Sequence, residues 1–255
     1  MGRTISIITI SYNSERTIEK TLKSVLTQSY RPLEYVLVDG DSKDSTVLII
    51  EKYIPQFLEK GIAVNFISEP DNGISDAFNK GIQRTTGEII GIINSDDMLE
   101  QNILEEVAAC FDGDIGVVCG DCMWVDAIKK TKYIRKSKMN LHRLKYDMVL
   151  MHPTCFVHKS VYERYGVFDT DLKYCMDKDI MARFYKNDVK FKYIPKVIAL
   201  MSAGGVSDIN YKKVFDEGVI IAERNGVSHV VAIIYRDYKI LRINLIRLIR
   251  RFSRR

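Results

Sequence analysis

Two adjacent carboxylates, Asp96 and Asp97, follow an apolar run that begins at Glu88. An unbroken run of this kind is typical of a strand buried on both faces of a parallel sheet. Because ligands of such sheets bind beyond the carboxyl ends of the strands, the pair is predicted to face a crevice. There it would offer hard oxygen ligands to Mg²⁺ or Mn²⁺. The structural alternative is that both acids cap a helix beginning near Leu99.

The elements that would position this pair alternate between strand and helix. Apolar runs predict strands at 5–10, 34–38 and 63–68, and a fourth in the run that starts at Glu88. Helical spacing predicts helices between them, the first capped by Asn13 or Ser14 and the next two running from 46 through 53 and from 74 to about 84. This alternation predicts right-handed crossovers and a parallel sheet with helices on both faces.

Polar residues at three strand ends are expected to converge on one crevice. They are Thr9, Ser11 and Asn13 after the first strand, Asp39 after the second, and Asp96 with Asp97 after the fourth. The sequence has no G-x-G-x-x-G after the first strand and no G-x-x-x-x-G-K-[ST], which disfavours dinucleotide dehydrogenases and P-loop enzymes. A polyphosphate held without a glycine-rich loop needs a metal, so a metal-assisted nucleotide pocket is predicted.

Basic residues are concentrated at the C-terminus. The 255-residue chain has a formal net charge of +5, whereas residues 229–255 hold eight basic residues and one acid, a balance of +7. Subtracting +7 from +5 leaves −2 for the remainder. From position 238 onward, apolar residues at helical spacing are interleaved with arginines, which predicts a basic amphipathic helix on an anionic membrane surface. Docking on the protein's own body or on a partner subunit is the alternative, and nucleic acid is not expected.

The five cysteines form an odd set without framework spacing, which indicates a reducing compartment. Cys119 and Cys122 have the C-x-x-C form, but no second pair accompanies them, so a zinc or redox role is disfavoured. The sequence shows no signal peptide and no apolar run near 18 residues long. We therefore expect a cytoplasmic protein, peripherally bound to the inner face of the cell membrane.

Four segments, taken in order, resemble the family 2 glycosyltransferases, which have the GT-A fold and invert the configuration of the transferred sugar. The segments are 7–13 (IITISYN), 38–46 (VDGDSKDST), 71–81 (DNGISDAFNKG) and 86–97 (TGEIIGIINSDD). The resemblance covers nearly the whole body, from Ile5 to about Ser207. The family often has proline at Ile10 and threonine at Ser11, and both departures leave the strand-end backbone available.

This resemblance implies a donor site. Asp39 would hydrogen-bond the base of a uridine-type nucleotide, Asp97 would be the principal metal ligand, and Asp96 would face the ribose, the sugar and the metal. The other strand-end donor residues that the resemblance implies are Thr9, Ser11, Asn13 and Ser95. Three further residues lie on one face of a predicted helix by their i, i+3 and i+4 spacing: Asp76, Asn79 and Lys80. By resemblance they would approach the diphosphate or sugar, and the alternative is a solvated polar face.

The second half would supply the acceptor side. Sequence patterns predict strands at 115–119 and 123–125 and a short helix at 160–165. His152 would touch the acceptor or diphosphate, or else it is a structural histidine. By resemblance, Asp177 is the general base that takes the proton from the acceptor hydroxyl.

Three further features of the second half bear on the predicted acceptor side. The family usually has glutamate where this chain has Met176, which removes a neighbour of Asp177. Asp179 is the fallback base, with a helix-capping role as the alternative for both aspartates. The segment 201–207 resembles a mobile glycine loop, in which Gly205 and Ser207 would contact the acceptor or diphosphate.

Together these features predict an α/β protein with a GT-A domain at 1–208, divided into a nucleotide-sugar half (1–98) and an acceptor half (99–208), and a helical region at 209–255. Its function would be metal-dependent inverting hexosyl transfer from a UDP-sugar to a saccharide acceptor on polyprenyl diphosphate, in bacterial O-antigen or capsule synthesis. The alternatives are a sugar nucleotidyltransferase and a non-catalytic module that binds nucleotide-sugars at the membrane surface. The sequence does not identify the sugar, the linkage or the acceptor. It also does not decide the oligomeric state, for which a homo-oligomer is one option.

Overall fold

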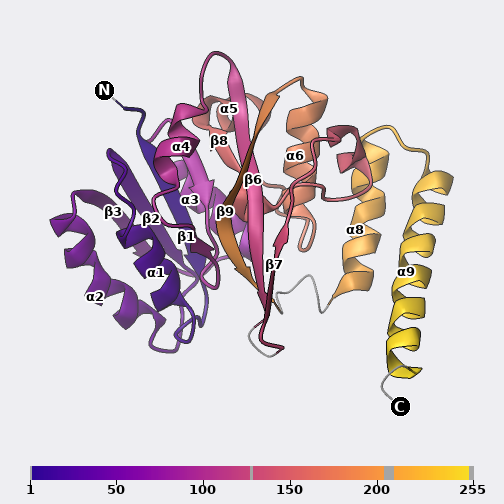
Figure 1. Cartoon of the computed structure of the whole chain (residues 1–255), viewed down its shortest axis with the longest axis horizontal. Coiled ribbons are helices and arrows are strands. Elements are labelled where there is room, and N and C mark those ends of the chain that lie inside the picture. Colours follow the sequence, from indigo (N-terminus) through magenta and orange to yellow (C-terminus); the bar gives the residue numbers. More distant parts are fainter. Residues whose placement is uncertain (1, 127–128, 204–209, 253–255) are drawn as a thin grey trace.

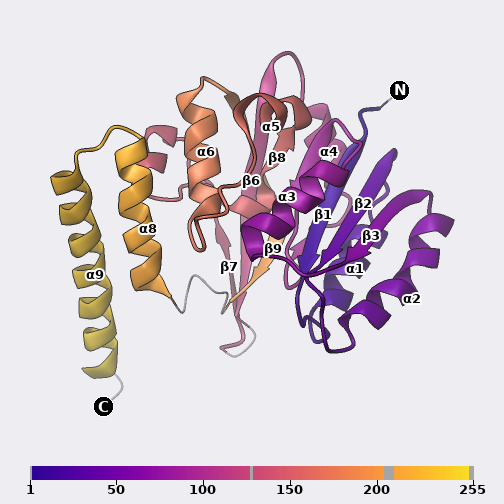
Figure 2. The same cartoon turned by 180° about the vertical axis from the view of Figure 1, so that it is seen from behind.

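The structure is a computed structural model that describes residues 2–126, 129–203 and 210–252. Helices cover both faces of a central sheet (Figures 1 and 2). In chain order the elements are β1 Ile5–Ser11, α1 Ile18–Leu26, β2 Leu33–Asp39, α2 Thr46–Glu59, β3 Ile62–Ser68, α3 Ile74–Arg84, β4 Ile89–Ile92, β5 Met98–Leu99, α4 Leu104–Ala109, β6 Ile115–Asp126, β7 Thr131–Arg135, η1 Leu141–Lys145, η2 His152–Thr154, β8 Phe156–His158, α5 Lys159–Tyr165, α6 Met176–Lys186, β9 Lys190–Ser202, α8 Tyr211–Arg224 and α9 His229–Phe252.

The N-terminal half is a parallel sheet in the order β3-β2-β1-β4. Neighbouring residues of β1 point to opposite faces: Ile7 joins the core under α1 and α2, whereas Ile8 joins the core under α3. Both faces of the sheet are therefore buried, which explains the continuous apolar runs. The predicted strand and helix order of this half is confirmed, and α2 continues to Glu59.

The second half turns the sheet from parallel to mixed. β8 pairs antiparallel with both β4 and β6, and β6 pairs parallel with β9 along most of its length. Register shifts near Gly120 and Asp121 bend this long pair, and the end of β9 meets β5. Because β5 follows β4 closely in the chain, this curl brings Ser202, at the end of β9, back to the carboxyl end of β4.

Two sequence predictions about this region are wrong. No helix begins near Leu99, because Met98–Leu99 form β5 and the next helix begins at Leu104. The strands predicted at 115–119 and 123–125 are one strand, β6, because pairing with β9 continues through the residues between them.

The start of the first helix was also predicted wrongly. α1 begins at Ile18 after the N-cap residue Thr17. Asn13 has a φ of 48°, in the left-handed region that asparagine tolerates better than most residues. The backbone N–H of Ser14 donates to Thr46 Oγ1 at 2.7 Å. The loop after β1 therefore reaches across to the start of α2 before α1 begins.

Helices α8 and α9 lie side by side at the end of the molecule opposite α2 (Figure 1). A small core of Val219, Ala222, Val227 and Ala232 joins them. On its outer side α9 leaves apolar residues exposed at helical spacing, which we call the α9 stripe: Val230, Ile234, Tyr238, Leu241, Leu245 and Ile249. Across the described residues, no helix combines the length and apolar character needed to cross a membrane.

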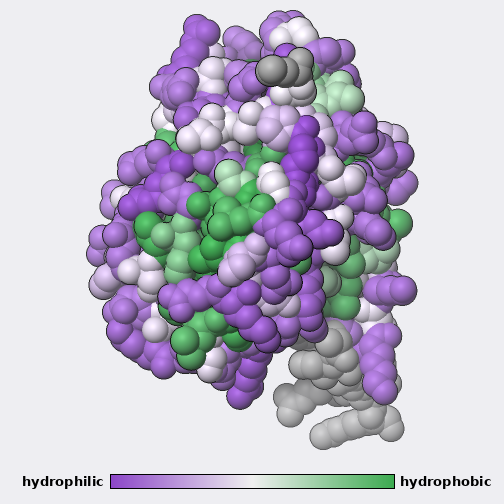
Figure 3. Space-filling model, turned by 90° about the vertical axis from the view of Figure 1, so that its left-hand side faces the viewer, coloured by the Kyte–Doolittle hydropathy of each residue, from purple (hydrophilic) through white to green (hydrophobic). Residues whose placement is uncertain are grey.

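The opposite end of the molecule also carries apolar surface (Figure 3). This face belongs to α2 and the edge strand β3. Leu48 and Leu58 of α2 are exposed, and Val64 and Phe66 of β3 are half-buried.

Candidate active site

Asp39, the last residue of β2, is fully buried and surrounded by serines. Ser11 Oγ donates to its Oδ1 at 2.9 Å, and Ser68 Oγ donates to its Oδ2 at 2.8 Å. Ser42 donates twice, from its Oγ to Oδ1 at 2.5 Å and from its backbone N–H to Oδ2 at 2.8 Å. An ionised carboxylate accepts about four hydrogen bonds. Asp39 is therefore saturated by its own neighbours, and a nucleotide base would have to replace one of them.

Thr9 lies inside the sheet. It is fully buried, and its Oγ1 accepts a hydrogen bond from the hydroxyl of Tyr35 at 2.9 Å. Burial raises the pKa of Tyr35, so this hydroxyl keeps its proton. Thr9 thus anchors β1 to β2 inside the sheet, and its predicted contact with the donor stays a prediction.

The loops after β1, β2 and β4 meet at the carboxyl edge of the sheet. Asn13 donates its backbone N–H to Ser42 Oγ at 2.8 Å and accepts the N–H of Lys43 at 2.8 Å. The Oγ atoms of Ser14 and Ser95 lie 2.9 Å apart. The three strand ends therefore converge, as the sequence predicted.

Asp97 is only 2% exposed, just beyond the end of β4. Its side chain accepts two long hydrogen bonds, from the N–H of Ser202 at 3.2 Å and from the amide of Asn94 at 3.3 Å. Burial and the neighbouring charge of Asp96 raise the pKa of Asp97 to about 7, and burial also raises the pKa of Asp96. Thr21 of α1 fixes the backbone by donating to the carbonyl of Asp97 at 2.7 Å. The fold thus holds two repelling carboxylates in place.

The donor set of this pair fits a divalent cation. In the part of the chain that the structure describes, no lysine or arginine contributes to the pKa of either carboxylate, so their charge lacks a cationic partner. The described residues contain no cluster of three or more histidine, cysteine or acidic ligands. Asp96 and Asp97 would therefore supply two ligands, and oxygens of a bound molecule or water would supply the rest.

The polar residues of α3 form hydrogen bonds and ion pairs with neighbouring residues of the protein. The side-chain amide of Asn79 donates to the carbonyl of Phe168 and accepts its N–H, both at 2.9 Å. Lys80 pairs with Glu69 at 3.2 Å and lies 3.5 Å from Asp76. These contacts tie α3 to the loops around it, and the role of the three residues in donor binding stays a prediction.

Asp177 stands half-buried in the first turn of α6, where its Oδ1 accepts the N–H of Lys178 at 2.7 Å. His152 packs between Phe78 and Phe168, with ring centroids 5.9 and 5.8 Å away. Burial lowers the pKa of His152, although the charge of Asp177 acts in the opposite direction. The second half therefore places a carboxylate close to a histidine whose neutral form is favoured.

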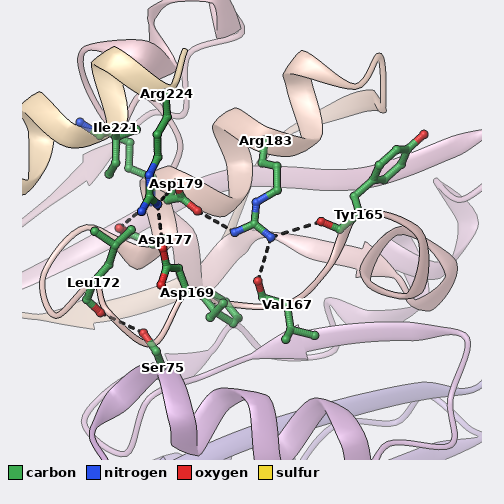
Figure 4. A network of polar contacts seen from close by, with 12 residues as sticks. Ser75, Tyr165, Val167, Asp169, Leu172, Asp177, Asp179, Arg183, Ile221 and Arg224 are labelled. Atoms are coloured by element: carbon green, nitrogen blue, oxygen red, sulfur yellow. Dashed lines mark hydrogen bonds and ion pairs between the residues drawn. The ribbon is translucent and has the colours of Figure 1, made fainter. Parts of the chain in front are cut away.

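Asp179 belongs to an ion-pair network (Figure 4). It is 5% exposed, with Arg183 Nη2 2.6 Å from its Oδ2 and Arg224 Nη1 3.4 Å from its Oδ1. Arg183 also donates to the carbonyls of Tyr165 and Val167, at 3.2 and 2.9 Å. The carboxylate of Asp179 is thus held by arginines, and this network joins α6 to α8 and to the loop after α5.

α8 also fixes the loop that leads into α6. The carboxylate of Glu217 accepts three backbone N–H groups, from Lys173, Tyr174 and Cys175, each at 2.8 Å. The helix that carries Asp177 is therefore positioned by the C-terminal region.

Comparison with known proteins identifies the family. Residues 6–166, more than half of the chain, match the model described as glycosyl transferase family 2. The chain belongs to glycosyl transferase family 2.

Relatives of this family 2 glycosyltransferase include one protein of similar length and one that is longer. A PGL/p-HBAD biosynthesis glycosyltransferase of Mycobacterium bovis (strain BCG / Pasteur 1173P2) is 27% identical over 242 residues, 92% of this chain and 91% of the relative. The uncharacterized glycosyltransferase RT0329 of Rickettsia typhi is 26% identical over 194 residues, 71% of this chain and 58% of that protein.

Solved structures confirm the GT-A fold. S. aureus TarS 1-349 in complex with UDP-GlcNAc has a TM-score of 0.68 at 20% identity, over 90% of this chain and 69% of TarS 1-349; against a longer TarS structure the match spans 41% of that chain. The mannosyltransferase PcManGT from Pyrobaculum calidifontis, in complex with GDP-Man and Mn²⁺, has a TM-score of 0.67 at 18% identity, over 89% of this chain and 66% of PcManGT.

Several residues of this family 2 glycosyltransferase that build the site were not among the predicted site residues. Ser42 and Ser68 saturate Asp39, while Thr21 and Ser202 hold the chain at Asp97. Ser42 lies within a matched motif and was detectable from it, whereas the other three act through contacts distant in sequence. Two predicted residues, Gly205 and Ser207, fall in 204–209, outside the described residues.

The C-x-x-C pair lies inside β6. Cys119 and Cys122 are buried free thiols. Burial raises the pKa of both to about 12, so both are protonated at neutral pH. Protonated thiols are poor metal ligands and nucleophiles.

Proposed function

We propose that this family 2 glycosyltransferase is a metal-dependent, inverting hexosyltransferase that uses a UDP-sugar. Its acceptor would be a saccharide on polyprenyl diphosphate, in bacterial O-antigen or capsule synthesis. The observation that carries the proposal is the pair Asp96 and Asp97, placed where three strand ends meet and without a cationic partner among the described residues. Buried charge without a partner is costly, which favours a site completed by a ligand.

Donor binding is assigned to residues 1–98 and acceptor binding to 99–208. Asp97 and Asp96 would hold Mg²⁺ or Mn²⁺, which neutralises charge on the leaving diphosphate when bound. Asp39 would accept the N–H of the uracil ring in exchange for a serine hydroxyl such as that of Ser68. The TarS complexes with UDP and UDP-GlcNAc, and that of PcManGT with GDP-Man and Mn²⁺, support a nucleotide-sugar donor and a divalent metal.

Asp177 would act as general base. It takes the proton from an acceptor hydroxyl while that oxygen bonds to the anomeric carbon, and the bond from this carbon to the diphosphate oxygen breaks with its electron pair. Attack from the face opposite the leaving group inverts the configuration. Asp177 suits this role because it is partly accessible and its carboxylate is not held by an arginine among the described residues, in contrast to Asp179.

The donor site is tested first by thermal shift of the purified protein with UDP, GDP, CMP and dTDP, each with Mn²⁺ or EDTA. A ligand of the native state raises the melting temperature. We expect a shift with UDP that requires Mn²⁺ and is lost in Asp97→Asn. A protein that responds to no nucleotide would contradict the proposal.

The reaction is tested by UDP release with donor and acceptor together and with each alone. We expect release to require both, and Asp177→Asn to lower it by about 10² to 10⁴-fold, the usual contribution of a general base, with the UDP shift unchanged. Wild-type rates in Asp177→Asn would remove this residue from its role. Absence of UDP release with donor and acceptor together would favour the non-catalytic module or the sugar nucleotidyltransferase.

The C-terminal helix would place the enzyme on the cytoplasmic face of the membrane. The α9 stripe is exposed over several turns, and residues 229–255 carry a balance of +7. An apolar stripe beside excess positive charge matches the interface of an anionic bilayer.

Membrane binding is tested by co-sedimentation with phosphatidylglycerol-containing and pure phosphatidylcholine vesicles. Leu241 and Leu48 are equally exposed, at 69%, but only Leu241 lies on the α9 stripe. We expect Leu241→Glu to weaken binding to anionic vesicles and Leu48→Glu to leave it unchanged. Equal binding of both variants, or a wild type that stays in the supernatant, would exclude this surface.

A further inference from the structure

A cavity of about 180 Å³ opens beside Asp177, on the side of α6 that faces α8 and α9. Its walls include aromatic side chains from four segments, namely Tyr146, Tyr174, Phe215 and Tyr235. The volume is below that of drug-sized ligand pockets and suits one small group of a larger ligand. The proposed base therefore borders this cavity, whose lining residues do not include the strand-end residues Asp39, Asp96 and Asp97.

Lys178 lines this cavity as a buried cation. It is 4% exposed, and its Nζ makes one long hydrogen bond, to the carbonyl of Tyr146 at 3.4 Å. Within the described residues no carboxylate lies at ion-pair distance from it. Burial lowers the pKa of Lys178, against the opposing charges of Asp177 and Asp147. An ammonium in such a place loses hydration without gaining a partner.

Two of the other charged groups around the cavity, Asp147 and Arg236, are already paired, and the third is the proposed base Asp177. Asp147 accepts Lys239 Nζ at 2.7 Å and Arg143 Nη2 at 3.1 Å, and it also accepts the hydroxyl of Tyr235. Arg236 lies 3.5 Å from Asp216 and also pairs with its neighbour on α9. Asp147 thus has its own cations, and Lys178, which has no ion-pair partner among the described residues, is available to an outside anion.

The helix opposite leaves room for this amine. A Cβ atom at Gly218 of α8 would lie 3.3 Å from Lys178 Nζ, tighter than most packed contacts. Glycine at this position therefore keeps the wall beside the ammonium open.

From these contacts we infer that the cavity is the acceptor pocket and that Lys178 binds a phosphate group of the acceptor. The inference rests on the proposed function, because Asp177 is the group that would meet the acceptor hydroxyl. The aromatic walls would cover the apolar face of a sugar ring or the first part of a lipid chain, with the phosphate oxygens accepting hydrogen bonds from Nζ. The acceptor class is then a saccharide phosphate or diphosphate, not a neutral sugar.

The test is isothermal titration calorimetry of the full chain with UDP and Mn²⁺ present, so that the donor crevice is filled. The probes are N-acetylglucosamine 1-phosphate, farnesyl diphosphate and neutral N-acetylglucosamine. We expect a phosphate probe to bind the wild type and Lys178→Met to bind it at least about tenfold more weakly, since a buried charged contact is lost. Lys132→Met, an exposed lysine of β7, is the matched control and should bind as the wild type does.

The two phosphate probes distinguish the source of the anion. Preference for farnesyl diphosphate assigns the phosphate to a lipid, and preference for the sugar phosphate assigns it to a saccharide; both support the pocket. Unchanged binding in Lys178→Met, or tighter binding of the neutral sugar than of either phosphate probe, overturns it. Removal of an unpaired buried charge should not lower the melting temperature, and Lys178→Gln is the second variant if the methionine does not fold.

Failure of this inference is separable from failure of the proposed function. A UDP shift that persists in Lys178→Met while phosphate probes bind it normally removes only the acceptor pocket. Absence of the UDP shift in the wild type removes the donor site, whatever the phosphate probes do.

Discussion

Asp97 and Asp179 are both almost fully buried, at 2% and 5% exposure, yet their surroundings differ in charge. Asp179 lies among arginines, with Arg183 at 2.6 Å and Arg224 at 3.4 Å. Asp97 has Asp96 as its charged neighbour and two long hydrogen bonds from uncharged groups. Arginines therefore balance the charge of Asp179, whereas no cation among the described residues balances the charge of Asp97.

This difference shows that burial alone does not identify a functional carboxylate. A buried acid with arginine partners has its charge balanced within the protein, so substituting it should lower the free energy of unfolding. A buried acid beside a second acid is held in place against electrostatic repulsion, so substituting it should mainly lower activity. Substituting each aspartate with asparagine tests these two expectations.

The largest expected effect is on transfer. Asp97→Asn should lower the rate of UDP release by on the order of 100-fold or more, because the proposed metal ligand is lost. Asp179→Asn should lower it far less, because Asp179 acts through the position of α6. Initial rates of both variants, measured at saturating Mn²⁺ on protein shown to be folded by circular dichroism, check this. Equal losses of the UDP release rate in the two variants would show that the difference in surrounding charge does not distinguish Asp97 from Asp179 in function.

The next effect is on stability as a function of pH, measured without metal. The folded-state pKa of Asp97 is about 7, above the unfolded value near 4, so the folded state binds the extra proton between these limits. The contribution of Asp97 therefore becomes unfavourable as pH rises from about 4 to about 7 and stays so above. Three pKa units correspond to about 4 kcal/mol as an order of magnitude.

Asp97→Asn should therefore gain stability over the wild type as pH rises, reaching a difference of a few kcal/mol above pH 7. Urea unfolding in EDTA from pH 5 to 8 measures it, with Asp188→Asn as the substitution at an exposed position. A difference that shrinks with rising pH would show that Asp97 is stabilised as a carboxylate.

Much of the N-terminal half was predictable because its signals are local. The strands of the parallel sheet are mostly apolar runs, so the position of Asp39 at the end of β2, and of Asp97 shortly after β4, followed from the sequence. The errors lie where long-range contacts decide. β5 is two residues long and exists because β9 pairs with it, and β6 continues through Gly120 because the bulged pairing with β9 accommodates a turn-like sequence.

The C-terminal half shows the same limit at the level of single residues. Asp177 was selected through its motif, but its neighbours in the fold were not predicted. Glu217 and Arg224 come from α8, and only folding brings them to α6. Lys178 lies between two predicted residues, yet its burial depends on α8 covering it. Sequence patterns indicate which residues begin a helix, not what packs over them.

A moderate effect is expected on global stability. Asp179→Asn should lower the free energy of unfolding by about 1–3 kcal/mol, less than the 3–5 typical of a fully buried pair, because both arginines keep other partners. Arg183 retains two carbonyls, and Arg224 retains Asp169 at 2.7 Å. Urea unfolding compared with Asp177→Asn, in the same helical turn, isolates the arginine contribution. Equal destabilisation by the two would mean that the network adds nothing.

The smallest effect is expected at the outer edge of the same network. The side chain of Arg224 is 45% exposed, so Arg224→Met should cost less than about 1 kcal/mol of unfolding free energy. A double-mutant cycle between Arg224→Met and Asp179→Asn measures the coupling across the α6–α8 contact, with Lys186→Met as a neighbouring control. Coupling near zero would leave Glu217 as the main link by which α8 positions α6. Coupling as large as the loss in Asp179→Asn alone would instead make Arg224 the partner that completes Asp179, and the contrast with Asp97 would then depend on the C-terminal helices being docked.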